Sequence, residues 1–231
     1  MIDFHSLIIR ITIFLVVSTL LVVTGLRKEP GLGILGAILI IAVTLWLRRA
    51  GFVDLGFAQP ADFGRTVWLA VLLGIGIQLL SVVFIEPLSE RITRSRHDHS
   101  VVDAVKGSWA VLVQWLLIVW LTVAVLEEGI YRGFLMTEFR EIAGDRTGAV
   151  IANVLITSTV FGLSHGYQNR SGILSTGIIG VLLGLIFVWS EYNLWLPILT
   201  HGFIDTVGIG MIALGWDRLF RRLLWGQDSA G

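Results

Sequence analysis

The chain has 231 residues, of which 55% are hydrophobic and 15% charged, and its mean hydropathy is +0.83. Soluble domains are about a quarter charged, so this composition is that of a membrane protein. The 17 basic and 17 acidic residues give a formal net charge of zero, which offers no electrostatic case for a nucleic-acid partner. The sequence has no cysteine, and this excludes disulfides, a thiol nucleophile and thiolate metal ligands.

Hydrophobic runs long enough to cross a bilayer follow one another along the chain. The first, Leu7 to Leu26, lacks a small-residue cleavage site and is interpreted as a retained helix, not a signal peptide. The runs cover residues 7–26, 31–47, 66–85, 109–136, 149–165, 172–189 and 195–214. We therefore predict one all-α structural domain, a polytopic transmembrane bundle of about seven to eight spanning helices.

Polar stretches separate several of these runs. Residues 50–65, with Pro60, are expected to form a loop or a short surface helix, and Glu86-Pro87 is expected to end the third span. Residues 88–108 are the most polar part of the chain and are predicted to lie in water. An eighth helix would lie near residues 52–63 or in the polar tail, residues 215–231.

The distribution of Lys and Arg between the loops predicts the orientation. With seven spans, ten basic residues fall on the side of Arg27 and five fall on the side of Arg48. The richer set is Arg27, Lys28, Arg91, Arg94, Arg96, Lys106, Arg170, Arg218, Arg221 and Arg222. The positive-inside rule then places the amino terminus outside and the carboxyl terminus in the cytoplasm.

Three ionisable residues interrupt the fourth run: Glu127, Glu128 and Arg132. Charges at membrane depth are costly unless they are paired or used. Glu128 and Arg132 are four residues apart, so on a helix they share a face and can form an ion pair. Glu127 points about 100° away, which leaves it as an unbalanced carboxylate. A purely structural ion pair is the alternative interpretation of this stretch.

Histidines supply the other candidate site residues. His165 and His201 lie in hydrophobic runs, and Asp205 follows His201 by one helical turn. Together with Glu127 they make an acid–base or metal-binding set. The remaining three, His5, His97 and His99, are expected to be solvated, with a weak metal site at His97 and His99 as the alternative.

The order and spacing of three motifs resemble those of a known family. The motifs are Glu127-Glu128-Gly-Ile-Tyr-Arg132, Phe161-Gly-Leu-Ser-His165 and His201-Gly-Phe-Ile-Asp205. Glu-Glu-x-x-x-Arg, Phe-x-x-x-His and His-x-x-x-Asp/Asn, in separate hydrophobic helices, are similar to those of the CAAX prenyl protease and bacteriocin-processing (Abi) intramembrane peptidases. The resemblance covers residues 109–214 and implies a catalytic core there, preceded by amino-terminal helices and a polar loop in residues 1–108.

The resemblance implies that the chain hydrolyses a peptide bond of a membrane-associated or lipidated peptide or protein, in a prokaryotic plasma membrane. Glu127 would be the general base and His165 its partner in activating water. His201 and Asp205 would stabilise the oxyanion or orient the site, and Glu128 with Arg132 would form a structural pair. Some relatives have Asn at the position of Asp205. An ionised Asp cannot donate a hydrogen bond, so Asp205 more naturally accepts one from His201 or ligates a cation.

Two alternatives stay open on the residues alone. Glu127, His165, His201 and Asp205 offer two nitrogens and two carboxylates, a set that suits one divalent cation, Zn²⁺ first among them. The absence of a His-Glu-x-x-His helix favours the metal-free water mechanism, in which no cofactor is required. The same residues could also serve a proton- or ion-coupled transporter, and the fold could serve a non-catalytic bacteriocin-immunity or sorting factor.

Bringing these residues together places a demand on the fold. In a simple seven-helix arrangement Glu127 and His201 lie towards one membrane face and His165 towards the other. They can meet only where helices are tilted, broken or displaced in depth, and the long fourth run gives room for this. We predict a water-filled cavity that opens to one side and admits the substrate, lined also by Tyr131 and Phe161, with Trp115 as a further candidate.

Overall fold

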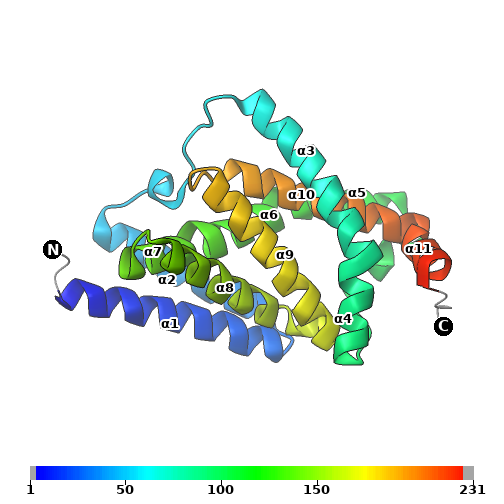
Figure 1. The fold of residues 1–231 in the computed structure, drawn as a ribbon, viewed down its shortest axis with the longest axis horizontal. Coiled ribbons are helices and arrows are strands. Elements are labelled where there is room, and N and C mark those ends of the chain that lie inside the picture. The colour runs from blue at the N-terminus through cyan, green and yellow to red at the C-terminus, as the bar shows by residue number, and fades with distance from the viewer. Residues whose placement is uncertain (1–3, 226–231) are drawn as a thin grey trace.

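The computed structural model describes residues 4–225, which fold as helices joined by short turns and loops, with no strand in that range (Figure 1). The α-helices are α1 (Phe4–Leu26), α2 (Pro30–Arg48), α3 (Phe63–Leu80), α4 (Glu86–Thr93), α5 (Trp109–Ile118), α6 (Ala124–Glu128), α7 (Thr137–Ala143), α8 (Thr147–Ser164), α9 (Asn169–Trp189), α10 (Trp195–Leu214) and α11 (Trp216–Trp225). The predicted all-α fold is therefore confirmed.

Seven helices in the described residues are long and apolar enough to cross a membrane. They cover His5–Leu26, Pro30–Arg48, Phe63–Thr93, Trp109–Ala143, Thr147–Ser164, Gly166–Trp189 and Trp195–Leu214. Each contains or largely overlaps one of the seven predicted runs. Of the two places named for an eighth helix, Phe52–Leu55 forms a 3₁₀ turn and α11 has ten residues in the described part of the tail, and neither described element is long enough to span; residues 226–231 lie outside the described residues.

The third span is longer than predicted, and its expected end at Glu86-Pro87 is wrong. The helix continues to Thr93 through a π-helical segment, Ser81–Ile85, which lies directly before Pro87. A proline inside an α-helix removes a hydrogen bond and collides with the preceding turn, and a wider π-turn is a recognised way to relieve such a conflict. As a result α4 carries two buried polar residues, Glu86 and Ser89, and Ser89 belongs to the stretch 88–108 that was predicted to lie in water.

The fourth span carries the paired carboxylates and is also irregular. Two π-helical segments, Val119–Val123 and Gly129–Met136, flank the short helix α6, which contains Glu127 and Glu128. A π-turn adds a residue to the helical repeat and so changes the direction of the side chains that follow. For the motif residues to meet, helices had to be tilted or broken. The π-helical segments of the fourth span and the tilt of the crossing helices in Figure 1 meet this requirement.

The hydrophobic core joins the two halves of the chain. One cluster of buried side chains combines residues of α1 and α2, such as Val17 and Ala37, with residues of the fourth span, such as Phe134 and Leu135. A second cluster packs α3 against α9 and α10, and a third packs α5 and the turn Ser100–Val105 against α10. Ion pairs also connect the helices of the first cluster, since Arg10 of α1 and Arg48 of α2 both bind Glu138 of α7.

Helices α8 and α9 approach closely at a pair of glycines. A Cβ built on Gly162 would lie 2.6 Å from the backbone oxygen of Ile173 and 2.9 Å from the Cα of Gly177. Both neighbours are backbone atoms, which cannot move out of the way without separating the helices. Because Gly162 precedes His165 by less than one turn, this contact also sets the position of the first candidate site histidine.

We expect Gly162→Ala to destabilise the protein by about 1–3 kcal/mol, the usual effect of overpacking a tight contact. Gly148→Ala is the matched control, because it lies in the same helix and a Cβ there meets nothing within 4 Å. The control should be neutral or slightly stabilising, since Ala is the better helix former. Thermal unfolding of the two variants in detergent checks this, and equal melting temperatures would contradict the close-packing account.

Candidate active site

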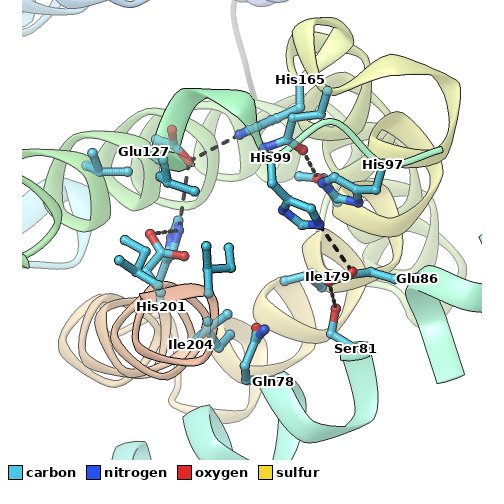
Figure 2. A pocket seen from close by; sticks show the side chains of 18 of the residues that line it. Gln78, Ser81, Glu86, His97, His99, Glu127, His165, Ile179, His201 and Ile204 are labelled. Carbon is cyan, nitrogen blue, oxygen red and sulfur yellow. Dashed lines mark hydrogen bonds and ion pairs between the residues drawn. The ribbon is translucent and has the colours of Figure 1, made fainter. Parts of the chain in front are cut away.

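The four predicted site residues line one cavity of ≈ 200 Å³ (Figure 2). Glu127 comes from α6, His165 follows the last residue of α8, and His201 and Asp205 lie one turn apart on α10. Segments that are far apart in the sequence therefore meet at one point, as the motif order predicts. Phe161 also lines the cavity, again as predicted.

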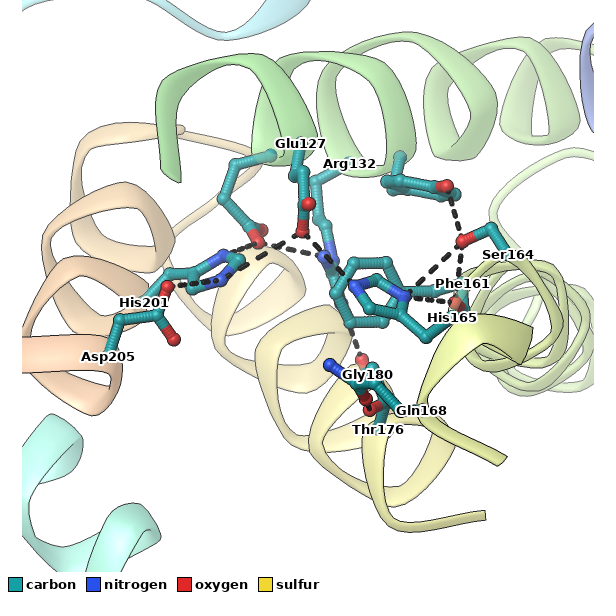
Figure 3. A network of polar contacts seen from close by, with 12 residues as sticks. Glu127, Arg132, Phe161, Ser164, His165, Gln168, Thr176, Gly180, His201 and Asp205 are labelled. Atoms are coloured by element: carbon teal, nitrogen blue, oxygen red, sulfur yellow. Dashed lines mark hydrogen bonds and ion pairs between the residues drawn. The ribbon is translucent and has the colours of Figure 1, made fainter. Parts of the chain in front are cut away.

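Glu127 lies between the two histidines (Figure 3). Its Oε2 is 3.8 Å from Nε2 of His165 and 3.9 Å from Nε2 of His201. The residue is 8% exposed, so its carboxylate has little contact with solvent. Both imidazole rings thus turn the same nitrogen, Nε2, towards one carboxylate oxygen.

The backbone fixes the orientation of His165. Its Nδ1 is 2.8 Å from the carbonyl oxygen of Phe161, one turn earlier in α8. A carbonyl only accepts hydrogen bonds, so Nδ1 must carry the proton and donate it. In the neutral ring Nε2 is then left with a lone pair, directed to Glu127 and the cavity. This arrangement gives His165 the role of an acceptor towards water or a ligand.

His201 is oriented by Glu128, a carboxylate that was predicted only to pair with Arg132. Its Nδ1 is 2.8 Å from Oε1 of Glu128, while Asp205 lies 3.6 Å from the opposite nitrogen, Nε2. The expected hydrogen bond from His201 to Asp205 is therefore not the one that fixes the ring. Glu128 performs that function, and Asp205 faces the cavity with a side chain that is 28% exposed.

The predicted ion pair between Glu128 and Arg132 is present and fully buried. Nη1 of Arg132 is 2.8 Å from Oε1 of Glu128, and the side chains are 2% and 0% exposed. Arg132 also donates to the carbonyl oxygen of Gly180 on α9, at 3.0 Å, and its guanidinium lies 4.5 Å from the centre of the Phe161 ring. One oxygen of Glu128 therefore joins the ion pair to His201, which links the structural pair to the site.

Aromatic rings pack around this network. Phe161 contacts the rings of His165, His201 and Tyr131 edge to face. Tyr131 is buried behind Phe161 and donates to Oγ of Ser164 at 2.7 Å, so the prediction that it lines the cavity is wrong. Trp115, the further candidate, packs against a separate hydrophobic cluster and is also absent from the cavity wall.

Glycines next to the histidines allow segments of the chain itself to approach closely. A Cβ on Gly202 would lie 2.7 Å from the indole ring of Trp120, and one on Gly166 would lie 2.9 Å from the backbone oxygen of Gly25. The indole Nε1 in turn donates to Thr206 at 3.0 Å. The space beside each histidine is thus used to pack the helices that carry the site.

The cavity also has lining residues that the sequence did not place there. They include Gln78, Ser81, Glu86, His97, His99 and Tyr167. The expectation that His97 and His99 are solvated is wrong in this respect, since both are partly buried and face the cavity. The His-x-His spacing is the one sequence feature that marks His97 and His99 as a pair. It does not indicate which helix the loop contacts.

The residues around Glu127 could hold a divalent cation through one carboxylate and two imidazoles, a donor set suited to Zn²⁺. Each Nε2 lies within 4 Å of Glu127. The ligand atoms of this set are not, however, all within 4.8 Å of one another. Among the described residues, the one group of three His, Asp or Glu side chains that meets this condition is Glu86, His97 and His99.

Residues 109–207 match a family model described as type II CAAX prenyl endopeptidase, Rce1-like. The match contains Glu127, Glu128, Arg132, His165, His201 and Asp205, and so covers every residue of the predicted site. Comparisons with curated proteins and with solved structures give no match. The matched range thus contains the residues that line the cavity around Glu127.

Proposed function

We propose that this chain, whose residues 109–207 match the Rce1-like family of type II CAAX prenyl endopeptidases, cleaves its substrate with a water activated by Glu127 and His165. The family and the seven apolar helices make it an integral membrane protein and a CAAX-type endopeptidase that acts on a peptide or protein. The chemical step, the residues that perform it and the nature of the substrate are the content of the proposal.

One observation carries the mechanism: two acceptors face each other across a gap that one water can bridge. Oε2 of Glu127 and Nε2 of His165 are 3.8 Å apart. A water between them can donate one hydrogen bond of about 2.8 Å to each. The proton on Nδ1 of His165 is held by the Phe161 carbonyl, which leaves Nε2 as an acceptor. The water oxygen is then directed away from both groups, towards the cavity.

In the reaction, the water oxygen attacks the scissile carbonyl carbon while Glu127 accepts a proton from the water. The carbonyl π-electrons move to the oxygen and form a tetrahedral oxyanion. The carbon–nitrogen bond then breaks, and the proton held by Glu127 passes to the departing amine. The products are a carboxylic acid and an amine, and Glu127 returns to its starting ionisation state.

His201 is the group we assign to the oxyanion. As an imidazolium it donates Nδ1–H to Glu128 and presents Nε2–H to the cavity, where a developing negative charge would accept the hydrogen bond. Glu127, Glu128 and Asp205 all lie within 4 Å of this ring and provide the countercharge. Glu128 is a positioning residue in this scheme, because it acts through His201.

The metal-assisted alternative uses the same side chains. Glu127 and the two histidines would hold one Zn²⁺, which would supply Lewis acidity and lower the pKa of a bound water. His165 already satisfies the requirement that a ligating imidazole donate its other nitrogen to a carbonyl or carboxylate, and so does His201. Chelator treatment of purified protein, followed by metal analysis and readdition of Zn²⁺, distinguishes the two schemes.

We propose a lipidated peptide or protein as substrate, presented from the bilayer of a prokaryotic plasma membrane, with no role for nucleic acid. The support is the depth of the site: Glu127, His165 and His201 are each under 10% exposed and lie among apolar helices. A substrate held in the membrane by a lipid would reach such a site without first crossing water.

A quenched fluorescent peptide tests the function directly. Purified protein in detergent should cleave a prenylated peptide faster than the same peptide without its lipid. Proteoliposomes that transport protons or ions but cleave neither peptide would instead support the transporter alternative. Equal cleavage of the two peptides would support the endopeptidase activity but contradict the proposal that the substrate is lipidated.

The position of Asp205 gives a second test. We expect Asp205→Asn to keep activity within about tenfold of the parent, because related enzymes have Asn at this position and the amide fills the same space. Asp205→Ala should fall by more than about tenfold, a loss of at least 1.4 kcal/mol of transition-state stabilisation. Measured kcat/KM values for the pair decide the matter, and equal activity of Asp205→Ala and the parent would remove Asp205 from the site.

A further inference from the structure

A second cluster of histidine and carboxylate side chains lies in the same cavity, away from Glu127 (Figure 2). It consists of Glu86, the first residue of α4, and His97 and His99, which precede the 3₁₀ turn Ser100–Val105. Their ligand atoms all lie within 4.8 Å of one another. None of the three belongs to the catalytic set, and all three precede residues 109–207, the segment that matches the family.

The arrangement of the three side chains is compact. Nε2 of His99 is 3.5 Å from Oε2 of Glu86, and the rings of His97 and His99 are parallel, with centres 4.2 Å apart. Glu86 is 7% exposed, so its carboxylate is removed from bulk water. Two imidazoles stacked beside a buried carboxylate place three good ligands for a transition metal at one point.

Neighbouring hydroxyl groups orient two of the ligands. Oγ of Ser81 donates to Oε1 of Glu86 at 3.2 Å, so the other oxygen, Oε2, is the one turned to His99. Oγ of Ser175 lies 3.2 Å from Nδ1 of His97 and within hydrogen-bond distance of two carbonyl oxygens of its own helix. Since its single proton goes to a carbonyl, the hydroxyl accepts from Nδ1–H, and Nε2 of His97 keeps the lone pair.

We propose that Glu86, His97 and His99 form a binding site for one divalent transition-metal ion of the Zn²⁺ class. Two imidazoles and one carboxylate are a common ligand set for Zn²⁺ with a water in the fourth position. A nitrogen ligand holds its ion in the plane of its own ring, so the two parallel rings must splay when the ion binds. His99 has the freedom to do so, with 30% of its side chain exposed.

The ion would fasten a loop across the cavity. Without it, two backbone contacts already hold this loop: the amide of His97 donates to Glu90 of α4, at 3.0 Å, and the amide of Asp98 donates to the carbonyl of Gln168, at 3.2 Å. A metal shared by Glu86 and the two histidines would strengthen the contact between the loop and α4 that His99 and Glu86 already make. The bound ion would thus stabilise the loop that forms one wall of the catalytic cavity.

Zn²⁺ binding to the full-length chain in detergent, measured by calorimetry after chelator treatment, tests the proposal. The parent should bind one Zn²⁺ that Glu127→Ala retains. His99→Ala should weaken that binding by at least about 100-fold, and Ser175→Ala, which removes only the group that orients His97, by about 10–100-fold. His5→Ala is the matched control, because His5 is exposed and outside the cavity, and it should bind as the parent does.

If the ion stabilises this loop, Zn²⁺ should also raise the melting temperature. This measurement detects any variant that fails to fold. Zn²⁺ should raise the melting temperature of Glu127→Ala but not that of Glu127→Ala combined with Glu86→Gln, because a ligand stabilises only a state that binds it. Zinc X-ray absorption of the Glu127→Ala protein should show two imidazole ligands. Zn²⁺ lost in Glu127→Ala and kept in His99→Ala, or unchanged affinity in both His99→Ala and Ser175→Ala, would overturn the proposal.

Discussion

Glu127→Gln is expected to lower kcat by about 10²–10⁴-fold, the usual contribution of a positioned general base. The amide occupies the same volume between His165 and His201, so the helices should pack as before, but it cannot accept a proton from water. Cleavage of the quenched peptide measures the loss, and the melting temperature in detergent reports the fold. A large fall in kcat with an unchanged melting temperature is the expected pair of results.

The matched control for this variant is Glu141→Gln, which makes the same chemical change at the end of the same span. Glu141 is 49% exposed in its side chain and pairs with Arg10 at 3.5 Å, far from the cavity. It should keep full activity. Parental kcat in Glu127→Gln would show that another group activates the water, and the proposed assignment of the base would then fail.

Arg132→Met should cost about 3–5 kcal/mol of stability, because it removes the guanidinium from the buried carboxylate of Glu128 and leaves His201 as its remaining partner. Methionine fills most of the space along the arginine stem but offers neither charge nor hydrogen bonds. The variant also loses the bond to Gly180 that ties the fourth span to α9. Unfolding in a graded mixture of detergents measures the effect, and Lys106→Met, at an exposed ion pair, should change stability by less than about 1 kcal/mol.

A double variant separates the cost of the stranded charge from the loss of packing. Glu128→Gln combined with Arg132→Met removes both members of the pair, so its stability should exceed that of Arg132→Met alone. Its activity should stay below that of the parent, because His201 exchanges a carboxylate partner for a neutral amide. If the double variant is less stable than Arg132→Met, then compensating the buried charge of Glu128 is not the main contribution of Arg132 to stability.

The cavity connects these two predictions. Glu127 and Glu128 are adjacent in the sequence, yet one faces the gap between the histidines and the other lies buried between Arg132 and His201. Their substitutions should therefore differ in kind: a change at Glu127 affects the chemical step, and a change at Glu128 or Arg132 affects stability and the position of His201.

Local spacing was enough to predict much of this site. Glu128 and Arg132 are four residues apart, and such a pair meets on any regular or mildly distorted helix, whatever surrounds it. The seven spans were also predictable from the sequence, because a helix needs a minimum number of consecutive apolar residues to cross a bilayer. The choice of Glu127 as the unpaired carboxylate followed from the same helical geometry.

Other features depend on contacts between distant segments, and no local pattern reports them. The bond from His201 to Glu128 joins α10 to α6, so it exists only because these helices cross at that depth. Pro87 looked like the end of a span, but the π-turn before it lets the helix continue and carries Glu86 inward. His97 and His99 looked solvated because their neighbours are polar, and packing of the loop against α4 and α9 places them in the cavity. Sequence by itself determined the spans and the ion pair, since these follow from composition and helical repeat. Only the tertiary structure decided which nitrogen faces which oxygen in the cavity, because that depends on how the helices cross.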